Sequence, residues 1–109
     1  MEIVYDKLVR DNIPEIIKSN SGEPHFRKLN DEEYWEYLLK KDSEELEEVR
    51  TASSFAERKQ ELADKLELIR AMAEFNGFTL QDIINETDRK KEKRGGFKKR
   101  LLLEKVIEK

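Results

Sequence analysis

Residues 44–64 read EELEEVRTASSFAERKQELAD and span the end of one expected helix and the start of the next. The segment TASS is the expected break between them. Glu45 and Glu48 are three positions apart, as are Glu61 and Asp64, so the two side chains of each pair point the same way from their helix. If the helices form an antiparallel hairpin through TASS, the two acid pairs can face each other near the loop.

The first helix of this hairpin is expected from Asp31 to Thr51. Asn30 followed by Glu33 has the spacing of a capping box at its start. An apolar stripe at 100° per residue predicts the buried face. It consists of Trp35, Leu39, Leu46 and Val49, with Leu38 at its edge.

The second helix is expected from Phe55 to Asn76, and Gly77 fits its C-terminal cap. It carries two apolar stripes, which predicts a helix packed on both sides. One comprises Phe55, Leu62, Leu66, Ile69 and Ala73. The other continues the line of the acids Glu61 and Asp64 through Leu68, Met72 and Phe75. The two acids are therefore expected to be at least partly buried.

The rest of the chain adds short elements. Residues 1–9 are expected to be extended, DNIPEIIKSN to form a short helix and SNSGEPHFRKL a loop. A third long helix begins at Thr79 and Asp82 in a capping pattern and runs to Gly95–Gly96. The tail FKKRLLLEKVIEK fits either a helix or a strand. The sequence thus predicts a single all-α domain, residues 1–109, built on a helical hairpin after a short extended N-terminal segment.

Composition agrees with one small helical domain. The chain has 109 residues, of which 43% are charged, yet 22 basic and 25 acidic groups leave a net charge of −3. Without cysteine, and with His25 alone in a loop, neither a disulfide framework nor a zinc site is expected. No apolar run of signal-peptide or membrane-spanning length occurs, so we expect a cytosolic protein with no membrane partner.

The paired acids have a chemical interpretation. Four carboxylates in one place repel one another, and their pKa values rise unless a cation lies among them. Carboxylate oxygens without His or Cys suit Mg²⁺ or Mn²⁺, and Mg²⁺ commonly shares its coordination with substrate phosphates. The alternative is that these acids are solvated, because Glu pairs at this spacing arise by chance in so acidic a chain.

Three blocks of the sequence resemble a known family. EELEE, followed twelve residues later by ELAD, resembles the EExxE…ExxD signature of the all-α nucleoside triphosphate pyrophosphohydrolases, the MazG-like and phosphoribosyl-ATP pyrophosphohydrolase-like group. YDKLVRDNIPEII is similar to the opening of one small branch of that group. KRGGF, residues 93–97, resembles the ERGGF near the end of that branch.

The resemblance implies helical hairpins that assemble into dimers or tetramers. It implies Mg²⁺-dependent hydrolysis of a nucleoside triphosphate between the α and β phosphates, giving the monophosphate and pyrophosphate. By position, the metal ligands would be Glu45, Glu48, Glu61 and Asp64. Glu44 would be an auxiliary acid that orients the attacking water.

Basic residues at both ends of the chain are the candidate substrate contacts. In KLVRD, Lys7, Arg10 and Asp11 would place two cations and an acid near the triphosphate, and otherwise form a charged surface segment. The run over residues 89–100 includes Lys93 and Arg94. It is open to three interpretations: a solvated helix end, a triphosphate contact, or a nonspecific nucleic-acid surface, the last being least favoured.

Two departures from the family pattern and one rival function remain open. Lys65 stands where the family has an apolar residue, and it either competes with a metal or is solvated. Arg100 stands where the branch commonly has Gly after RGGF. The rival function is a noncatalytic helical interaction module, associated with nucleic acid through residues 89–100.

Overall fold

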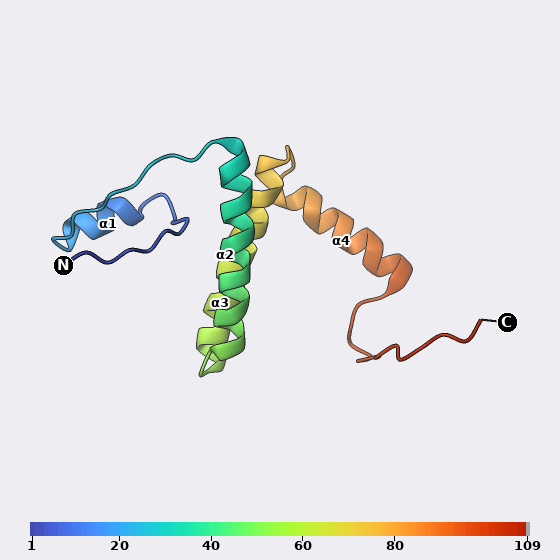
Figure 1. Cartoon of the computed structure of the whole chain (residues 1–109). Coiled ribbons are helices and arrows are strands. Elements are labelled where there is room, and N and C mark those ends of the chain that lie inside the picture. The colour runs from blue at the N-terminus through green and yellow to red at the C-terminus, as the bar shows by residue number, and fades with distance from the viewer. Residues whose placement is uncertain (109) are drawn as a thin grey trace.

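The computed structural model describes residues 1–108 and, over that range, contains helices but no strand. Two long helices, α2 (Asp31–Thr51) and α3 (Phe55–Phe75), lie side by side as an antiparallel hairpin (Figure 1). The short α1 (Ile13–Ser19) and the longer α4 (Leu80–Arg94) lie on opposite sides of it. The predicted all-α class is therefore confirmed, and the expected bounds of the first long helix are reproduced.

Side-chain caps begin the long helices where the sequence patterns predict. At the start of α2, Asn30 Oδ1 accepts a hydrogen bond from the Glu33 amide at 2.9 Å, and the Glu33 carboxylate accepts from the Asn30 amide. At the start of α4, Thr79 Oγ1 accepts from the Asp82 amide, and the Asp82 carboxylate accepts from the Thr79 amide at 2.8 Å. These pairs satisfy amides that a helix leaves without an internal partner.

The end of α3 explains Gly77. The Gly77 amide donates to the Glu74 carbonyl at 3.1 Å, and the Phe78 amide donates to the Ala73 carbonyl at 2.8 Å. This pair of bonds needs a left-handed residue after the helix, and Gly77 has φ +83°. The tight reversal directs α4 away from the hairpin.

The core lies toward the end of the hairpin where α2 begins and α3 ends. Trp35 stacks on Phe75 with ring centroids 5.7 Å apart, and Tyr34 meets the same ring edge-on at 5.5 Å. We call these three rings the aromatic end. The buried apolar side chains among residues 1–108 are Leu38, Leu68 and Ala73.

The expected buried face of α2 was partly wrong, although Trp35 and Val49 of the predicted stripe are half-buried. Leu38, placed at the edge of the stripe, is 1% exposed, whereas Leu39 is 41% exposed and Leu46 is 48% exposed. On α3, Leu68 of the second stripe is buried, while the first stripe stays mostly exposed. A helix with two apolar stripes, such as α3, can bury only one of them against a single partner helix. We call the exposed set the outer stripes: Leu39 and Leu46 on α2, and Leu62, Leu66 and Ile69 on α3.

The segments outside the hairpin bury little. Neither α1 nor α4 contains a buried residue. Asn12 precedes α1 without a side-chain capping bond, and Pro14 lies in the first turn of the helix. Residues 101–108 form neither a helix nor a strand, although both were considered for this tail. Arg100, where the resembled branch commonly has Gly, has φ +57°, a left-handed conformation that Gly adopts without steric cost.

The chain exposes far more surface than a folded monomer of its mass. Its accessible surface is 10343 Å², whereas about 6,300 Å² is usual for a 13.0 kDa monomer. Its radius of gyration is 18.5 Å, against about 13 Å for a compact domain of this size. Within residues 1–108, no helix has both the length and the apolar character needed to cross a membrane.

Candidate metal centre

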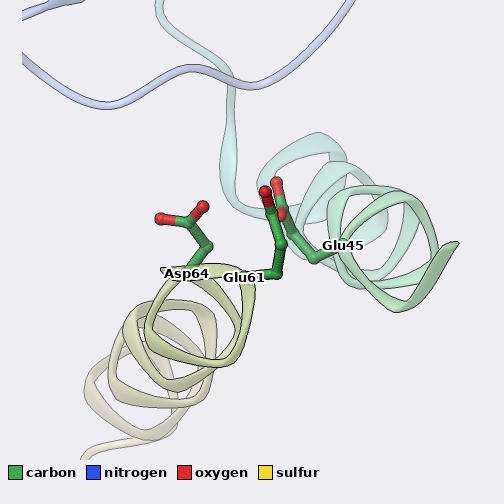
Figure 2. Close-up of side chains that lie close together, drawn as sticks. All are labelled: Glu45, Glu61 and Asp64. Carbon is green, nitrogen blue, oxygen red and sulfur yellow. The ribbon is translucent and has the colours of Figure 1, made fainter. Parts of the chain in front are cut away.

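Three acidic side chains meet between the two long helices on the loop side of the aromatic end. Glu45 projects from α2, and Glu61 and Asp64 project from α3 on the same side of the hairpin, with the Glu61 carboxylate beside that of Glu45 (Figure 2). One carboxylate oxygen from each lies within 4.8 Å of the others. We call these three residues the acidic cluster. The helical spacing that predicted a meeting of acids across the hairpin is therefore realised for three of the four proposed ligands.

Glu45 is the buried member of the cluster. It is 8% exposed, and its Oε2 atom has no hydrogen-bond partner. Burial raises the pKa of the Glu45 carboxyl, and the adjoining Glu61 carboxyl and the negative charge of Asp64 raise it further. The Lys41 ammonium, 3.9 Å from Glu45 Oε1, opposes this rise. A buried carboxylate with an unpaired oxygen is costly unless a proton or a cation joins it.

The N-terminal segment crosses this side of the hairpin and brings cations to the acids. Arg10 donates to Asp64 Oδ1 at 2.7 Å, and Lys7 donates to Glu44 Oε1 at 2.8 Å. Asp6 accepts from the Tyr37 hydroxyl at 3.1 Å. Two of the proposed phosphate-binding residues therefore lie beside the carboxylates, although Arg10 and Asp64 are 54 positions apart in the chain.

Glu44 lies next to the acidic cluster, between two ammonium groups. Its second oxygen is 3.6 Å from Lys41 Nζ. The hydrogen bond from Lys7 lowers the pKa of Glu44, with a further contribution from the charge of Lys41. The same bond raises the pKa of Lys7. Glu44 is thus held as a carboxylate. Sequence reasoning missed Lys41, although its spacing of four from Glu45 on one helix was a readable signal.

Lys65 does not compete with the cluster. Its Nζ donates to Asp42 Oδ1 at 2.8 Å in a partly buried pair that joins α3 to α2. Lys65 was expected either to compete with a metal or to be solvated. It instead forms an ion pair between the two long helices. Asp42 was not predicted to be part of the site, and nothing in its local spacing pointed to Lys65.

The remaining predicted residues lie apart from the cluster. Glu48 is exposed on α2 and is not part of the three-carboxylate group found within residues 1–108. Asp11 is exposed. The pKa of Tyr34 is raised mainly by the partial burial of Tyr34 itself and, in second place, by the negative charge of Asp11. Lys93 and Arg94 are exposed at the end of α4, which leads away from the hairpin (Figure 1). No hydrogen bond or ion pair among the described residues joins these last two to the acids.

Neither pocket found near the site encloses a nucleotide in one copy of the chain. A pocket of about 30 Å³ lies between residues 6–8 and α2 and includes Glu44. Ligand pockets usually measure about 300–1,000 Å³. A wider depression of about 330 Å³ surrounds the α2–α3 turn, and none of the proposed ligands lines it. Enclosing a nucleotide would need further walls.

The donor set fits a hard divalent cation. All three groups offer oxygen, and carboxylate oxygens are the ligands that Mg²⁺ and Mn²⁺ prefer. The unpaired Glu45 Oε2 is a second observation, because a cation would satisfy an atom that has no partner in the protein. Three protein carboxylates also leave positions for water or phosphate oxygens in an octahedral shell.

Comparison with known proteins gives a partial relative of unknown function. A protein from Mycolicibacterium smegmatis, described as uncharacterized, is 46% identical over 48 residues. The matched segment covers 44% of this chain and 49% of that protein, so the likeness spans about half of each. No protein-family model matches the chain. No solved structure matches it either.

Proposed function

We propose that this protein is a Mg²⁺-dependent nucleotide pyrophosphohydrolase, which converts a nucleoside triphosphate or related nucleotide into a monophosphate and pyrophosphate. The observation that carries the proposal is the acidic cluster, in which the buried Glu45, with one oxygen that has no hydrogen-bond partner, lies beside two further carboxylates. The likeness of EELEE…ELAD, KLVRD and RGGF to the all-α nucleoside triphosphate pyrophosphohydrolases supports the choice of reaction.

In this proposal the acidic cluster holds Mg²⁺ or Mn²⁺, with Glu48 as a further ligand from the next turn of α2. The bound ion would polarise the α-phosphate and lower the pKa of a coordinated water. Glu44, kept ionised by Lys7 and Lys41, accepts a hydrogen bond from the attacking water and orients it.

The N-terminal cations serve the other end of the triphosphate. Lys7 and Arg10 lie beside the acids, where they can hold the β and γ phosphates and stabilise the negative charge that develops on the leaving pyrophosphate. The α-phosphate on one side of the scissile bond would then contact the metal, and the β and γ phosphates on the other side would contact Lys7 and Arg10. The Arg10 side chain is more than half exposed, so its guanidinium can reach a substrate once it leaves Asp64.

We also propose that the working form is a homo-oligomer in which a second copy covers the outer stripes. The surface in excess of a compact monomer is about 4,000 Å², several times the roughly 800 Å² that each partner contributes to a standard interface. The same assembly would supply walls to an open site. It is also the arrangement in which Lys93 and Arg94 of one copy could reach the acids of another.

Sedimentation tests this assembly. Leu46→Lys places a charge in the outer stripes and should convert a dimer or larger species into a monomer, while Glu47→Lys, one position along on the exposed surface, should leave the assembly intact. Analytical ultracentrifugation at micromolar protein measures both. A wild-type chain that sediments as a folded monomer would refute the homo-oligomer.

The test of the activity is a panel of canonical and modified nucleoside triphosphates, assayed for pyrophosphate with Mg²⁺ and with EDTA. We expect pyrophosphate and monophosphate from at least one nucleotide, only with metal present. Release of orthophosphate would mean that a different bond is cut. Inactivity across the panel, combined with retention of nucleic acid through residues 89–100, would favour the noncatalytic interaction module.

A further inference from the structure

Three side-chain contacts hold residues 6–10, which we call the strap, across the hairpin beside the acidic cluster. Asp6 is bound by Tyr37 at 3.1 Å, Lys7 binds Glu44 at 2.8 Å, and Arg10 binds Asp64 at 2.7 Å. The first two contacts are to α2 and the third is to α3. Figure 2 shows a stretch of the N-terminal segment passing over the three carboxylates.

The three contacts differ in whether they involve a carboxylate of the acidic cluster. Tyr37 and Glu44 lie outside the acidic cluster, so the contacts of Asp6 and Lys7 take no oxygen from it. Asp64 belongs to the cluster, and Arg10 occupies its Oδ1. Arg10 is therefore the one strap residue whose contact is to a carboxylate of the acidic cluster.

Charge determines which contact breaks when a divalent cation binds. A guanidinium and a metal ion on one carboxylate repel each other, and the metal carries the larger charge. The ion pair that would be lost is weak, because Arg10 is 60% exposed and Asp64 is 39% exposed. Arg10 is thus the partner that leaves, while the contacts of Asp6 and Lys7 keep the strap anchored.

We propose that Arg10 exchanges partners: it neutralises Asp64 in the metal-free protein and, once a divalent cation occupies the acidic cluster, transfers its guanidinium to the polyphosphate of the substrate. The exchange rests on the proposed metal site. It makes binding ordered, because the cation that grips the polyphosphate becomes available only after the metal has displaced it. Metal-free protein then holds polyphosphate weakly.

The exchange predicts opposite effects of one substitution on two ligands. Arg10→Ala removes a competitor for Asp64, so Mn²⁺, measured by electron paramagnetic resonance, should bind about two- to fivefold more tightly, the factor that matches a weak exposed ion pair. Preformed manganese pyrophosphate should bind at least about tenfold less tightly, because one charge-assisted contact is lost. Arg10→Lys, which keeps the charge, should lie between the wild type and Arg10→Ala in both assays.

Arg27 provides a matched control. Arg27 donates to both oxygens of Glu33 on α2, away from the acidic cluster, so Arg27→Ala also removes an arginine and breaks an ion pair. It should change neither affinity. If Arg10 were purely structural, Arg10→Ala would weaken the binding of both ligands together. Thermal unfolding of each variant would then also show a loss of stability.

The possible failures are distinguishable. If the wild type binds no Mn²⁺, the metal site fails and the exchange with it. If the wild type binds Mn²⁺ but Arg10→Ala binds it equally or less tightly, the site stands and the exchange is overturned. If Arg10→Ala binds Mn²⁺ more tightly and manganese pyrophosphate no less tightly, Arg10 is only a competitor, and its transfer to polyphosphate is overturned.

Discussion

The two ends of the α2–α3 hairpin are built from the same pair of helices but differ in what joins them. At the aromatic end, Trp35 stacks on Phe75, and Leu38 is almost fully buried nearby. At the acidic cluster, the most buried side chain is Glu45, which has an unpaired oxygen and acidic neighbours. One end stabilises the hairpin by apolar burial, and the other places repelling charges in a partly dry site.

This difference separates the part of the hairpin that stabilises the fold from the part that contains the candidate metal site. Apolar burial contributes about 25 cal/mol per Å², so the packed end can support a cluster that is unfavourable without a cation. Local disagreement with folding rules is expected at functional sites, where other regions compensate for it. Substitutions at the aromatic end should therefore lower stability without changing metal binding. Substitutions at the acidic cluster should weaken metal binding and leave the metal-free protein as stable as the wild type or slightly more so.

The largest effect should come from Leu38→Ala. This change removes most of the side chain that is 1% exposed, and we expect it to lower the free energy of unfolding by about 2–5 kcal/mol. Leu39→Ala, at the neighbouring position that is 41% exposed, is the control and should lower the free energy of unfolding of the hairpin much less. Urea unfolding of both variants measures the difference, and equal losses would mean that the packing of α2 is not as described.

An intermediate effect should come from Gly77→Ala at the end of α3. A Cβ at Gly77 meets nothing within 4 Å, so the cost comes from its left-handed backbone, φ +83°. We expect a loss of about 1–2 kcal/mol. Gly96→Ala, at a glycine without a positive φ, is the matched control. If thermal unfolding shows Gly77→Ala to be neutral, the helix-ending bonds of Gly77 and Phe78 do not stabilise the fold.

The smallest effect should come from Glu45→Gln in metal-free protein, and it should depend on pH. Folding raises the pKa of Glu45 above its ordinary value of 4.5. The stability contributed by the protonated carboxyl is therefore complete below pH 4.5 and is lost as the pH rises through the raised value. Glu45→Gln should be increasingly more stable than the wild type as the pH rises over that window.

Urea unfolding in EDTA at a series of pH values measures this widening difference. Glu47→Gln, on an exposed position of the same helix, is the control and should run parallel to the wild type. A constant difference between Glu45→Gln and the wild type across the window would show that folding does not change the ionisation of Glu45.

Local signals predicted the helices well, because capping is local. Asn30 with Glu33, and Thr79 with Asp82, are three residues apart, and each capping box formed as expected. Gly77 was likewise readable as a cap. The spacing of the acids predicted the meeting of Glu45 with α3, because a short loop makes consecutive helices antiparallel neighbours.

The packing of the helix faces and the contacts between distant segments were not predictable from the same local patterns. α3 carries two apolar stripes, and which of them faces α2 depends on tertiary packing. On α2, the helical wheel placed Leu39 in the buried stripe and Leu38 at its edge, whereas packing against α3 buries Leu38 and leaves Leu39 41% exposed. The contact of Arg10 with Asp64 and that of Lys65 with Asp42 join distant segments, and a helical wheel contains no information on either. Lys93 and Arg94 were candidate triphosphate contacts because they belong to the basic run over residues 89–100, and within one copy they lie at the end of a separate helix.

The most direct test of the acidic cluster as a metal site is the thermal unfolding of the wild type and of Asp64→Asn, each with and without Mg²⁺. We predict that Mg²⁺ stabilises the wild type, by about 2.7 kcal/mol at one hundred times its dissociation constant. Asp64→Asn should unfold without metal at the wild-type temperature or slightly above it, and Mg²⁺ should not stabilise it. Equal stabilisation of both proteins, no stabilisation of the wild type, or a large loss of stability in metal-free Asp64→Asn would contradict the site.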